Sequence, residues 1–206
     1  MATTNEISVL FLDIGGVLLT NGWDRKMRQK AAEHFGLDFD EMDERHNMTS
    51  DSYEEGKLSL EEYLKLVVFH RKRQFGIDDF RDFLFSQTKP FPDMIKLLSG
   101  IAKKYNLKVG AISNEGRELT IFRINNFSLT EFIEFFICSC FVHLRKPDKD
   151  IYKMALDVGQ AKPQQTLYID DRELYIEVAD SLGIKAIHHT DINKTQKILL
   201  EYGLTL

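Results

Sequence analysis

The segment FLDIGGVLL, residues 11–19, places one acid, Asp13, between a hydrophobic run and a glycine-rich turn. The preceding residues Val9–Leu12 have the composition of a strand that is buried on both faces. The carboxylate of Asp13 would therefore lie at the end of a buried strand. Gly15 and Gly16 leave the following turn with little side chain, so backbone N–H groups can approach an anion there.

Outward from this segment, short hydrophobic runs alternate with helical patterns. We expect strands at 7–12, 107–112, 135–140, 166–170 and 184–188, and helices at 91–105, 116–126, 148–158, 172–182 and 191–202. Strands that alternate with helices are typical of a mainly parallel sheet with right-handed crossovers. The sequence therefore predicts an α/β fold, a Rossmann-like parallel sheet covered by helices on both faces.

One long stretch interrupts this alternation, because residues 22 to about 88 carry only helical signals. Within it, Ser59 and Glu62 have the spacing of a capping box at the start of a helix. We therefore expect an all-helical cap at residues 20–89, inserted into a core made of residues 1–19 and 90–206. An insertion directly after the first strand lies over the carboxyl ends of the strands, where open α/β sheets bind ligands.

Composition narrows the function classes for these 206 residues. A net charge of -5 without a long basic run argues against binding to nucleic acid. Hydrophobic runs stay short of the ~18 residues that cross a membrane. Residues 1–8, MATTNEIS, lack the basic and apolar regions of a signal peptide. Cys138 and Cys140, expected on one face of a strand as buried thiols, fit a reducing cytoplasmic location.

Polar residues gather at the ends of the expected strands. Asp13 ends the first strand, and the others follow at Ser113, Asn114, Lys146, Asp170 and Asp171. The carboxyl ends of parallel strands meet at one edge, and three clustered carboxylates remain ionised together only around a cation. Hard oxygen ligands suit Mg²⁺. Mg²⁺ with a lysine and a serine suits a phosphoryl group, and Asp13 would be the nucleophile that forms an aspartyl phosphate.

These motifs, in this order, resemble the haloacid dehalogenase superfamily and specifically its magnesium-dependent phosphatases. DIGGVLL resembles the nucleophile loop, ISN the second motif, RKPDKDIYKMAL the third, and YIDDRELYIEVADSLGIKAI the fourth. The segment YEEGKLSLEEYL is similar to the helical cap of the branch that includes glucose-1-phosphatase-like proteins and the epoxide-hydrolase N-terminal domain. The resemblance covers nearly the whole chain.

The resemblance implies a role for each motif residue in the hydrolysis of a small phosphate monoester such as a sugar phosphate. Asp13 would be the nucleophile and a Mg²⁺ ligand, together with the Gly15 carbonyl and Asp171. Asp170 would bind the metal ion or its water. The phosphoryl group would be held by the remaining motif residues, which are Gly16, Ser113, Asn114 and Lys146.

Two positions depart from the family pattern. The family usually has a second aspartate, the general acid and base, where this chain has Gly15. Loss of a positioned acid typically lowers the rate by ~10²–10⁴-fold, so we expect a preference for phosphates with good leaving groups. In addition, Leu174 and Tyr175 stand where the branch often has an asparagine near the metal ligands.

Two other function classes remain open from the sequence. A dehalogenase of the same superfamily typically has Ser-Asn where this chain has Asp170 and Asp171, and the acidic pair favours phosphate chemistry. A phosphate or metabolite binder without catalytic activity is kept open by Gly15. The cap residues Trp23 and His46 are either core residues or substrate contacts, and amphipathic helices favour the core.

Overall fold

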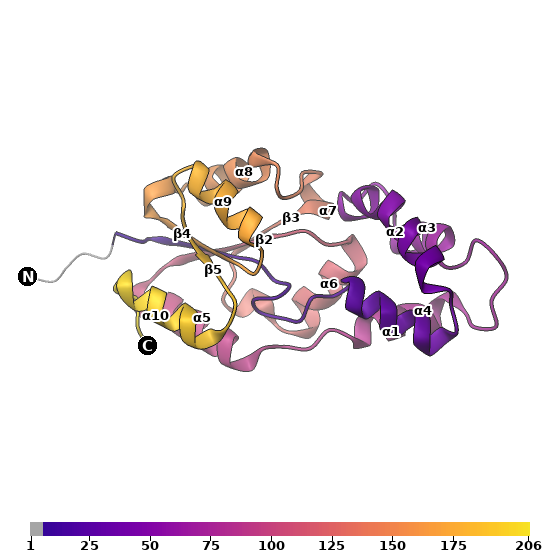
Figure 1. Ribbon diagram of the computed structural model, residues 1–206. Coiled ribbons are helices and arrows are strands. Elements are labelled where there is room, and N and C mark those ends of the chain that lie inside the picture. The colour runs from indigo at the N-terminus through magenta and orange to yellow at the C-terminus, as the bar shows by residue number, and fades with distance from the viewer. Residues whose placement is uncertain (1–5) are drawn as a thin grey trace, which may run out of the picture.

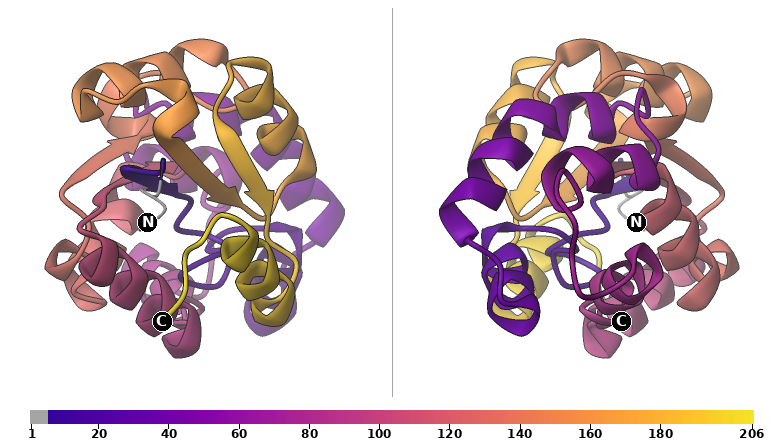
Figure 2. Two further views of the ribbon diagram at one scale, coloured as in Figure 1. Left: turned by 90° about the vertical axis from the view of Figure 1, so that its left-hand side faces the viewer. Right: turned by 90° about the vertical axis from the view of Figure 1, so that its right-hand side faces the viewer.

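A five-stranded parallel sheet forms the centre of the molecule (Figures 1 and 2). The computed structural model describes residues 6–206. The strand order is β3-β2-β1-β4-β5, and each neighbouring pair is parallel. The strands are β1 (Val9–Leu12), β2 (Lys108–Ser113), β3 (Phe135–Cys138), β4 (Thr166–Asp170) and β5 (Lys185–His188). The predicted α/β class and all five strands are confirmed.

Strand β1 lies in the middle of the sheet, and its four side chains are buried. Alternation sends them to opposite faces. Phe11 packs in a cluster with residues of α8 (Lys149–Gly159) and α9 (Glu173–Ser181). Leu10 and Leu12 pack on the other face with α5 (Pro92–Tyr105) and α10 (Ile192–Glu201). Burial on both faces explains the uninterrupted hydrophobic run before Asp13.

The core helices begin and end within two residues of their predicted positions. The remaining core elements are α6 (Arg117–Asn126), α7 (Ser139–Val142) and the short 3₁₀ helices η1 (Leu129–Glu131) and η2 (Pro163–Gln165). One expectation was wrong: β3 ends at Cys138, and Cys140 lies in α7 rather than on the same strand face. Both cysteines are buried and free. The hydrophobic run FFICSCF continues past the strand because α7 is also packed inside the protein.

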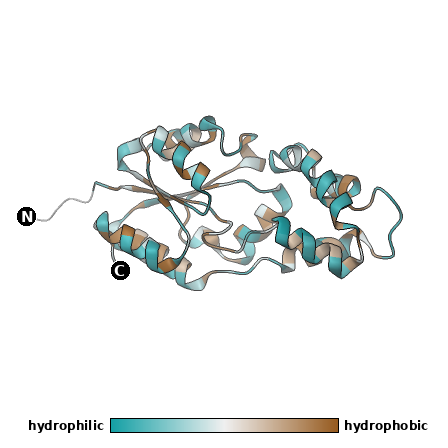
Figure 3. Ribbon diagram, in the orientation of Figure 1, coloured by the Kyte–Doolittle hydropathy of each residue, from teal (hydrophilic) through white to brown (hydrophobic). Residues whose placement is uncertain are grey.

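The helical insertion, residues 20–89, contains α1 (Arg25–Phe35), α2 (Phe39–Glu54), α3 (Leu60–Val67) and α4 (Ile77–Ser86), with no named strand. The capping box is present, since Glu62 N donates to Ser59 Oγ at 3.2 Å and Ser59 N donates to Glu62 Oε2 at 2.9 Å. Trp23, Tyr63 and Phe80 belong to a separate hydrophobic cluster in the insertion. Figure 3 shows hydrophobic residues concentrated on the sheet strands and also inside this helical group.

The end of α2 docks onto the core beside α7 (Figure 1). Arg145 binds Glu54 at 2.6 Å and Asp51 at 2.7 Å, and Ser139 Oγ donates to the Glu54 carbonyl at 2.6 Å. Gly56, with φ +70°, lies so close to the Cys140 carbonyl that an added Cβ would collide with it. The insertion therefore contacts the core through a packed interface as well as through its two chain connections.

No helix within residues 6–206 combines the length and apolar character that a membrane crossing requires. The expectation about export was drawn partly from residues 1–5, which lie outside the described residues.

The close approach at Gly56 predicts a specific loss of stability. Gly36 is a matched control because it also has positive φ, +60°, but nothing lies within 4 Å of an added Cβ. Gly36→Ala should lower the free energy of unfolding by about 1–2 kcal/mol through backbone strain alone. Gly56→Ala should lower it by a further ~1–3 kcal/mol because the methyl group overpacks the interface. Urea unfolding of both variants measures the difference, and equal losses would contradict the packed interface.

Candidate active site

Asp13 follows β1 at the carboxyl edge of the sheet, where a buried lysine meets it. Its Oδ2 lies 3.2 Å from Lys146 Nζ, and its Oδ1 accepts from the N–H of Ile14 at 2.7 Å. Lys146 is only 1% exposed. Its ammonium also donates to Asp170 Oδ2 at 2.6 Å and to the Ile112 carbonyl at 3.0 Å. The predicted meeting of strand-end residues is present in the structure.

The position of Lys146 is held by the second motif. The side-chain amide of Asn114 donates to the Lys146 carbonyl at 2.8 Å and accepts from the Lys146 N–H at 2.9 Å. Burial acts to lower the pKa of Lys146, but the carboxylates of Asp13 and Asp170 outweigh it and raise the pKa. The lysine therefore stays cationic beside Asp13. The Asn114 side chain orients this lysine, a role that motif spacing alone did not reveal.

The two adjacent acids after β4 have different environments. Asp170 is completely buried, and its oxygens accept from Lys146, from the Tyr168 hydroxyl and from the Arg172 N–H. Asp171 has one oxygen, Oδ2, that accepts from Asn21 Nδ2 at 3.2 Å. Its other oxygen, Oδ1, is buried without a hydrogen-bond partner among the described residues. Asp171 thus has a free ligand atom, whereas the Asp170 oxygens are already engaged.

The two glycines after Asp13 meet different neighbours. Gly16 has φ +76°, and a Cβ there would collide with the Asp171 carboxylate, so glycine permits this close approach. Gly15 does not have positive φ. A Cβ on Gly15 would point toward Asn21 Oδ1 at 2.9 Å and Arg123 Nη1 at 3.7 Å. The backbone at Gly15 is therefore compatible with other residues, and only the Asn21 side chain would need to move.

The carboxylates provide a donor set for a divalent cation. Asp13, Asp170 and Asp171 each place an oxygen within 4.8 Å of the other two, although both Asp170 oxygens also accept hydrogen bonds from the protein. Burial raises the pKa of Asp13 to about 6, Lys146 opposes this, and the charges of the other two acids add to it. A buried oxygen without a partner, on Asp171, within an all-oxygen cluster is the arrangement that Mg²⁺ binds in proteins. The residues present therefore fit a magnesium ion.

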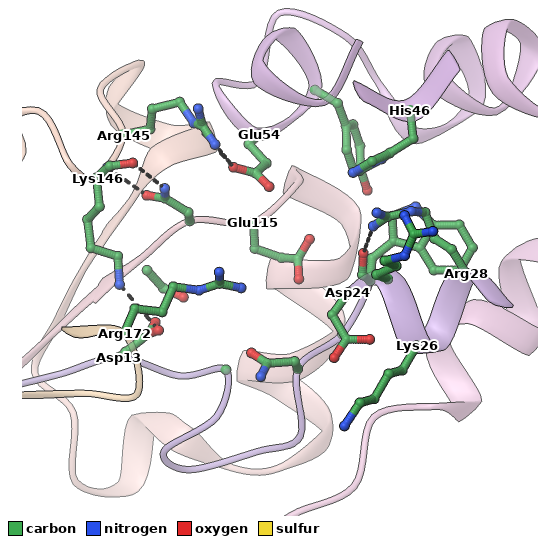
Figure 4. A pocket seen from close by; sticks show the side chains of 18 of the residues that line it. Asp13, Asp24, Lys26, Arg28, His46, Glu54, Glu115, Arg145, Lys146 and Arg172 are labelled. Atoms are coloured by element: carbon green, nitrogen blue, oxygen red, sulfur yellow. Dashed lines mark hydrogen bonds and ion pairs between the residues drawn. The ribbon is translucent and has the colours of Figure 1, made fainter. Parts of the chain in front are cut away.

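A cavity of about 660 Å³ lies between the sheet edge and the helical insertion (Figure 4). Of the predicted site residues it is lined by Asp13, Gly15, Ser113, Asn114 and Lys146. Gly16 and Asp171 instead line a neighbouring cavity, which shares Asn21 and Asp24 with the first. The first cavity carries many basic side chains, namely Arg25, Lys26, Arg28, Arg123, Arg145, Lys146 and Arg172. These seven basic side chains outnumber the four acidic ones, Asp13, Asp24, Glu54 and Glu115, so the lining favours an anionic ligand.

The insertion supplies a polar chain to the cavity through Trp23, Tyr63 and His46. Trp23 Nε1 donates to the Tyr63 hydroxyl at 2.6 Å, and that hydroxyl lies 2.7 Å from His46 Nδ1. A fully buried hydroxyl needs an acceptor for its proton, and the Trp23 N–H can only donate. The Tyr63 hydroxyl therefore donates to His46 Nδ1, and the neutral His46 ring carries its own proton on Nε2. Burial lowers the pKa of His46 to about 4, so the ring is neutral. Trp23 and His46 both line the cavity as well as packing in the insertion.

Glu115 and Arg123 are among the cavity residues that sequence reasoning missed. Arg123 is only 2% exposed, and its Nη1 lies 3.3 Å from Glu115 Oε2. Glu115 directly follows the ISN motif, so its position beside Asn114 was a usable signal. Arg123 lies two turns into α6, and its burial depends on the insertion folding back over that helix.

Several known proteins match the chain over most of its length. Flavin mononucleotide hydrolase 1 of Arabidopsis thaliana is 23% identical over 179 residues, covering 86% of this chain and 72% of that protein. A HAD family enzyme from Bacteroides thetaiotaomicron, solved as a magnesium complex, aligns with a TM-score of 0.73 at 21% identity, over 89% of this chain and 93% of its own. The same enzyme has been solved with magnesium and inorganic phosphate, with a TM-score of 0.68 and 19% identity, over 88% and 93% of the two chains.

A dehalogenase shares the fold as well. The L-2-haloacid dehalogenase from Xanthobacter autotrophicus aligns with a TM-score of 0.62 at 14% identity, over 97% of this chain and 84% of its own. At these identities, the structural similarities show the fold alone. The model of the haloacid dehalogenase-like hydrolases, however, matches residues 17–188, which span the helical insertion and three of the four sheet-edge motifs. With the Asp13 turn placed directly before that match, the chain belongs to the haloacid dehalogenase-like hydrolase family.

Proposed function

We propose that this protein is a magnesium-dependent phosphatase that hydrolyses a small phosphate monoester through a phosphorylated Asp13. Residues 1–19 and 90–206 form the catalytic core, and the helical insertion acts as its cap. The observation that carries the proposal is the position of Asp13, which lies 3.2 Å from the buried Lys146 ammonium and belongs to a cluster of three carboxylates. A bound cation and a lysine together reduce the repulsion between an anionic substrate and the carboxylate that attacks it.

In this mechanism the metal ion would be held by Asp13, Asp171 and the Gly15 carbonyl. When bound, it supplies positive charge to the phosphoryl oxygens and keeps the neighbouring carboxylates ionised. Lys146 neutralises charge on Asp13 and on the phosphoryl group. Asp170 supports the site by holding the Lys146 ammonium in place, with its Oδ2 2.6 Å from Lys146 Nζ.

The reaction begins with attack of an Asp13 oxygen on phosphorus, and the bond to the leaving-group oxygen breaks. Ser113 is 2% exposed, lines the cavity beside Asp13, and donates to the phosphoryl oxygens. The Asn114 backbone assists there. The expected part of Gly16 is not supported, because its N–H donates to the Leu19 carbonyl at 2.7 Å and Gly16 lines the neighbouring cavity. Water then attacks the phosphorus of the aspartyl phosphate, and inorganic phosphate leaves. Two relatives agree with this chemistry, since one is named a flavin mononucleotide hydrolase and another was solved with magnesium and phosphate.

The dehalogenase alternative uses the same fold and also a nucleophilic aspartate. The fold similarity to a haloacid dehalogenase does not separate the two reactions. The unpartnered Oδ1 of Asp171 favours the phosphatase, because a buried carboxylate oxygen without a hydrogen-bond partner is costly unless a cation binds it. The basic lining of the cavity fits an anionic substrate of either kind, because a haloacid is also an anion, and it does not separate the two reactions.

Replacement of the nucleophile tests the reaction directly. Asp13→Asn should lower turnover of p-nitrophenyl phosphate by at least ~10³-fold, because an amide is a poor nucleophile. The exposed acid Asp157 provides a control, and Asp157→Asn should leave turnover unchanged. Thermal unfolding of both variants checks that they are folded. Turnover retained in folded Asp13→Asn would contradict the covalent mechanism.

Metal dependence forms a second test. Treatment with EDTA should abolish phosphatase activity, and added Mg²⁺ should restore it. Asp171→Asn should weaken binding of Mg²⁺ alone by at least ~10-fold, as measured by titration calorimetry, because the free carboxylate oxygen is lost. Activity that survives exhaustive EDTA treatment would refute the metal role and favour the dehalogenase alternative.

A further inference from the structure

Gly15 leaves the nucleophile loop without a proton donor, but another carboxyl group faces the same cavity. We propose that Glu115 is the general acid and base of this enzyme, acting in place of a side chain at position 15. The inference rests on the proposed phosphatase function and names the group that protonates its leaving alcohol. It is supported by the position of Glu115, by its burial and by an unpartnered hydroxyl beside it.

Arg123 links Glu115 to the space beside Gly15. Its Nη1 lies 3.7 Å from the position of a Cβ on Gly15 and 3.3 Å from Glu115 Oε2. A side chain at position 15 would extend toward this nitrogen, and the Glu115 carboxyl group approaches the same nitrogen from the start of α6. Figure 4 shows Glu115 pointing into the cavity that also contains Asp13.

The Glu115 side chain is buried and held in place. It is 8% exposed, and its Oε1 accepts from the Gly116 N–H at 3.0 Å. Its backbone N–H donates to Ser139 Oγ at 3.1 Å. These contacts leave Oε2, beside Arg123, as the oxygen that can exchange a proton with a ligand.

Tyr53 provides an independent sign of a ligand at this place. It is 2% exposed and lines the cavity, and its hydroxyl has no hydrogen-bond partner within residues 6–206. Its ring lies directly against Gly116, where an added Cβ would collide with it. A buried hydroxyl normally has a partner. The oxygen of a substrate leaving group between Tyr53 and Glu115 would supply that partner.

The environment of Glu115 suits proton exchange near neutral pH. Burial raises the pKa of Glu115 to about 7, although Arg123 acts to lower it. Glu54 at the end of α2 and Asp13 just after β1 both act to raise it. The other titratable groups that sense Glu115 are Tyr53, Tyr63, Cys138 and Cys140. A general acid is most effective when its pKa lies near the working pH.

The proposed proton transfers balance over one cycle. As Asp13 forms its bond to phosphorus, the bond from phosphorus to the leaving oxygen breaks, and that oxygen takes the proton of Glu115. The Glu115 carboxylate then removes a proton from the water that attacks the aspartyl phosphate. Phosphate leaves, Asp13 is regenerated as a carboxylate, and Glu115 is protonated again.

A leaving-group comparison in single-turnover experiments tests the role. In Glu115→Gln with Mg²⁺, phosphoryl transfer from an alkyl phosphate should slow by ~10²–10⁴-fold, because the alkoxide then leaves unprotonated. Transfer from p-nitrophenyl phosphate should change by less than about tenfold, because its leaving group needs no proton. With p-nitrophenyl phosphate in excess over the enzyme, slow hydrolysis of the aspartyl phosphate should produce a burst of p-nitrophenol. The burst also shows that the variant is folded.

The pH profile provides a readout that a structural role would not change. Glu115 must be protonated to act as an acid, so the wild-type transfer rate from the alkyl phosphate should fall as pH rises above about 7. This decline should be absent in Glu115→Gln. Glu115→Asp should retain it with a lower maximum rate. Glu118 is a neighbouring acid on α6 that accepts from the Leu60 N–H at 3.0 Å and does not line the cavity. The control variant Glu118→Gln should therefore behave as wild type.

The outcomes separate this inference from the proposed function. Equal slowing on alkyl and aryl phosphates, or an unchanged pH profile in Glu115→Gln, would overturn the role of Glu115 while leaving the phosphatase intact. Absence of turnover by the wild-type protein on every ester would instead overturn the phosphatase. A steep dependence of the wild-type rate on leaving-group pKa would also overturn the inference, because it is the behaviour expected when Gly15 leaves no donor.

Discussion

The buried ammonium of Lys146, between the carboxylates of Asp13 and Asp170, is the interaction on which the rest of the site depends. Three charges at 1%, 7% and 0% exposure are stable together only because each has a partner. This requirement fixes the geometry on both sides of β1. It ties the Asp13 turn to the end of β4, and through the Asn114 amide it ties the end of β2 to the loop that carries Lys146.

The fold and the set of strand-end residues could be predicted because they follow from local patterns. Hydrophobic runs that end at Asp13, Ser113 and Asp170 specify a parallel sheet whose polar groups share one edge. The different environments of Asp170 and Asp171 could not be predicted, because they depend on which of the two carboxylates binds the Lys146 ammonium. Cys140 was misplaced because a buried helix turn and a buried strand have the same hydrophobic composition.

Long-range packing explains what else the sequence could not reveal. Arg123 is buried because the insertion covers α6, and no local pattern marks an arginine for burial. Many of the basic residues around the cavity are also already paired. Arg28 binds Asp43 at 2.7 Å, and Arg145 binds Glu54 at 2.6 Å. The positive potential that a ligand meets is therefore smaller than the number of basic side chains suggests.

The docking of α2 against the core links the position of the helical insertion to the proton affinity of Glu115. Tyr53 covers Gly116, and the Glu54 charge acts on Glu115, so the closed position of the helical insertion itself helps to raise the pKa of that carboxyl group. Separation of the two parts would hydrate Glu115 and lower its pKa. By thermodynamic reciprocity, protonation of Glu115 must favour the closed arrangement by the same free energy. Any separation of the helical insertion from the core would therefore favour release of the Glu115 proton.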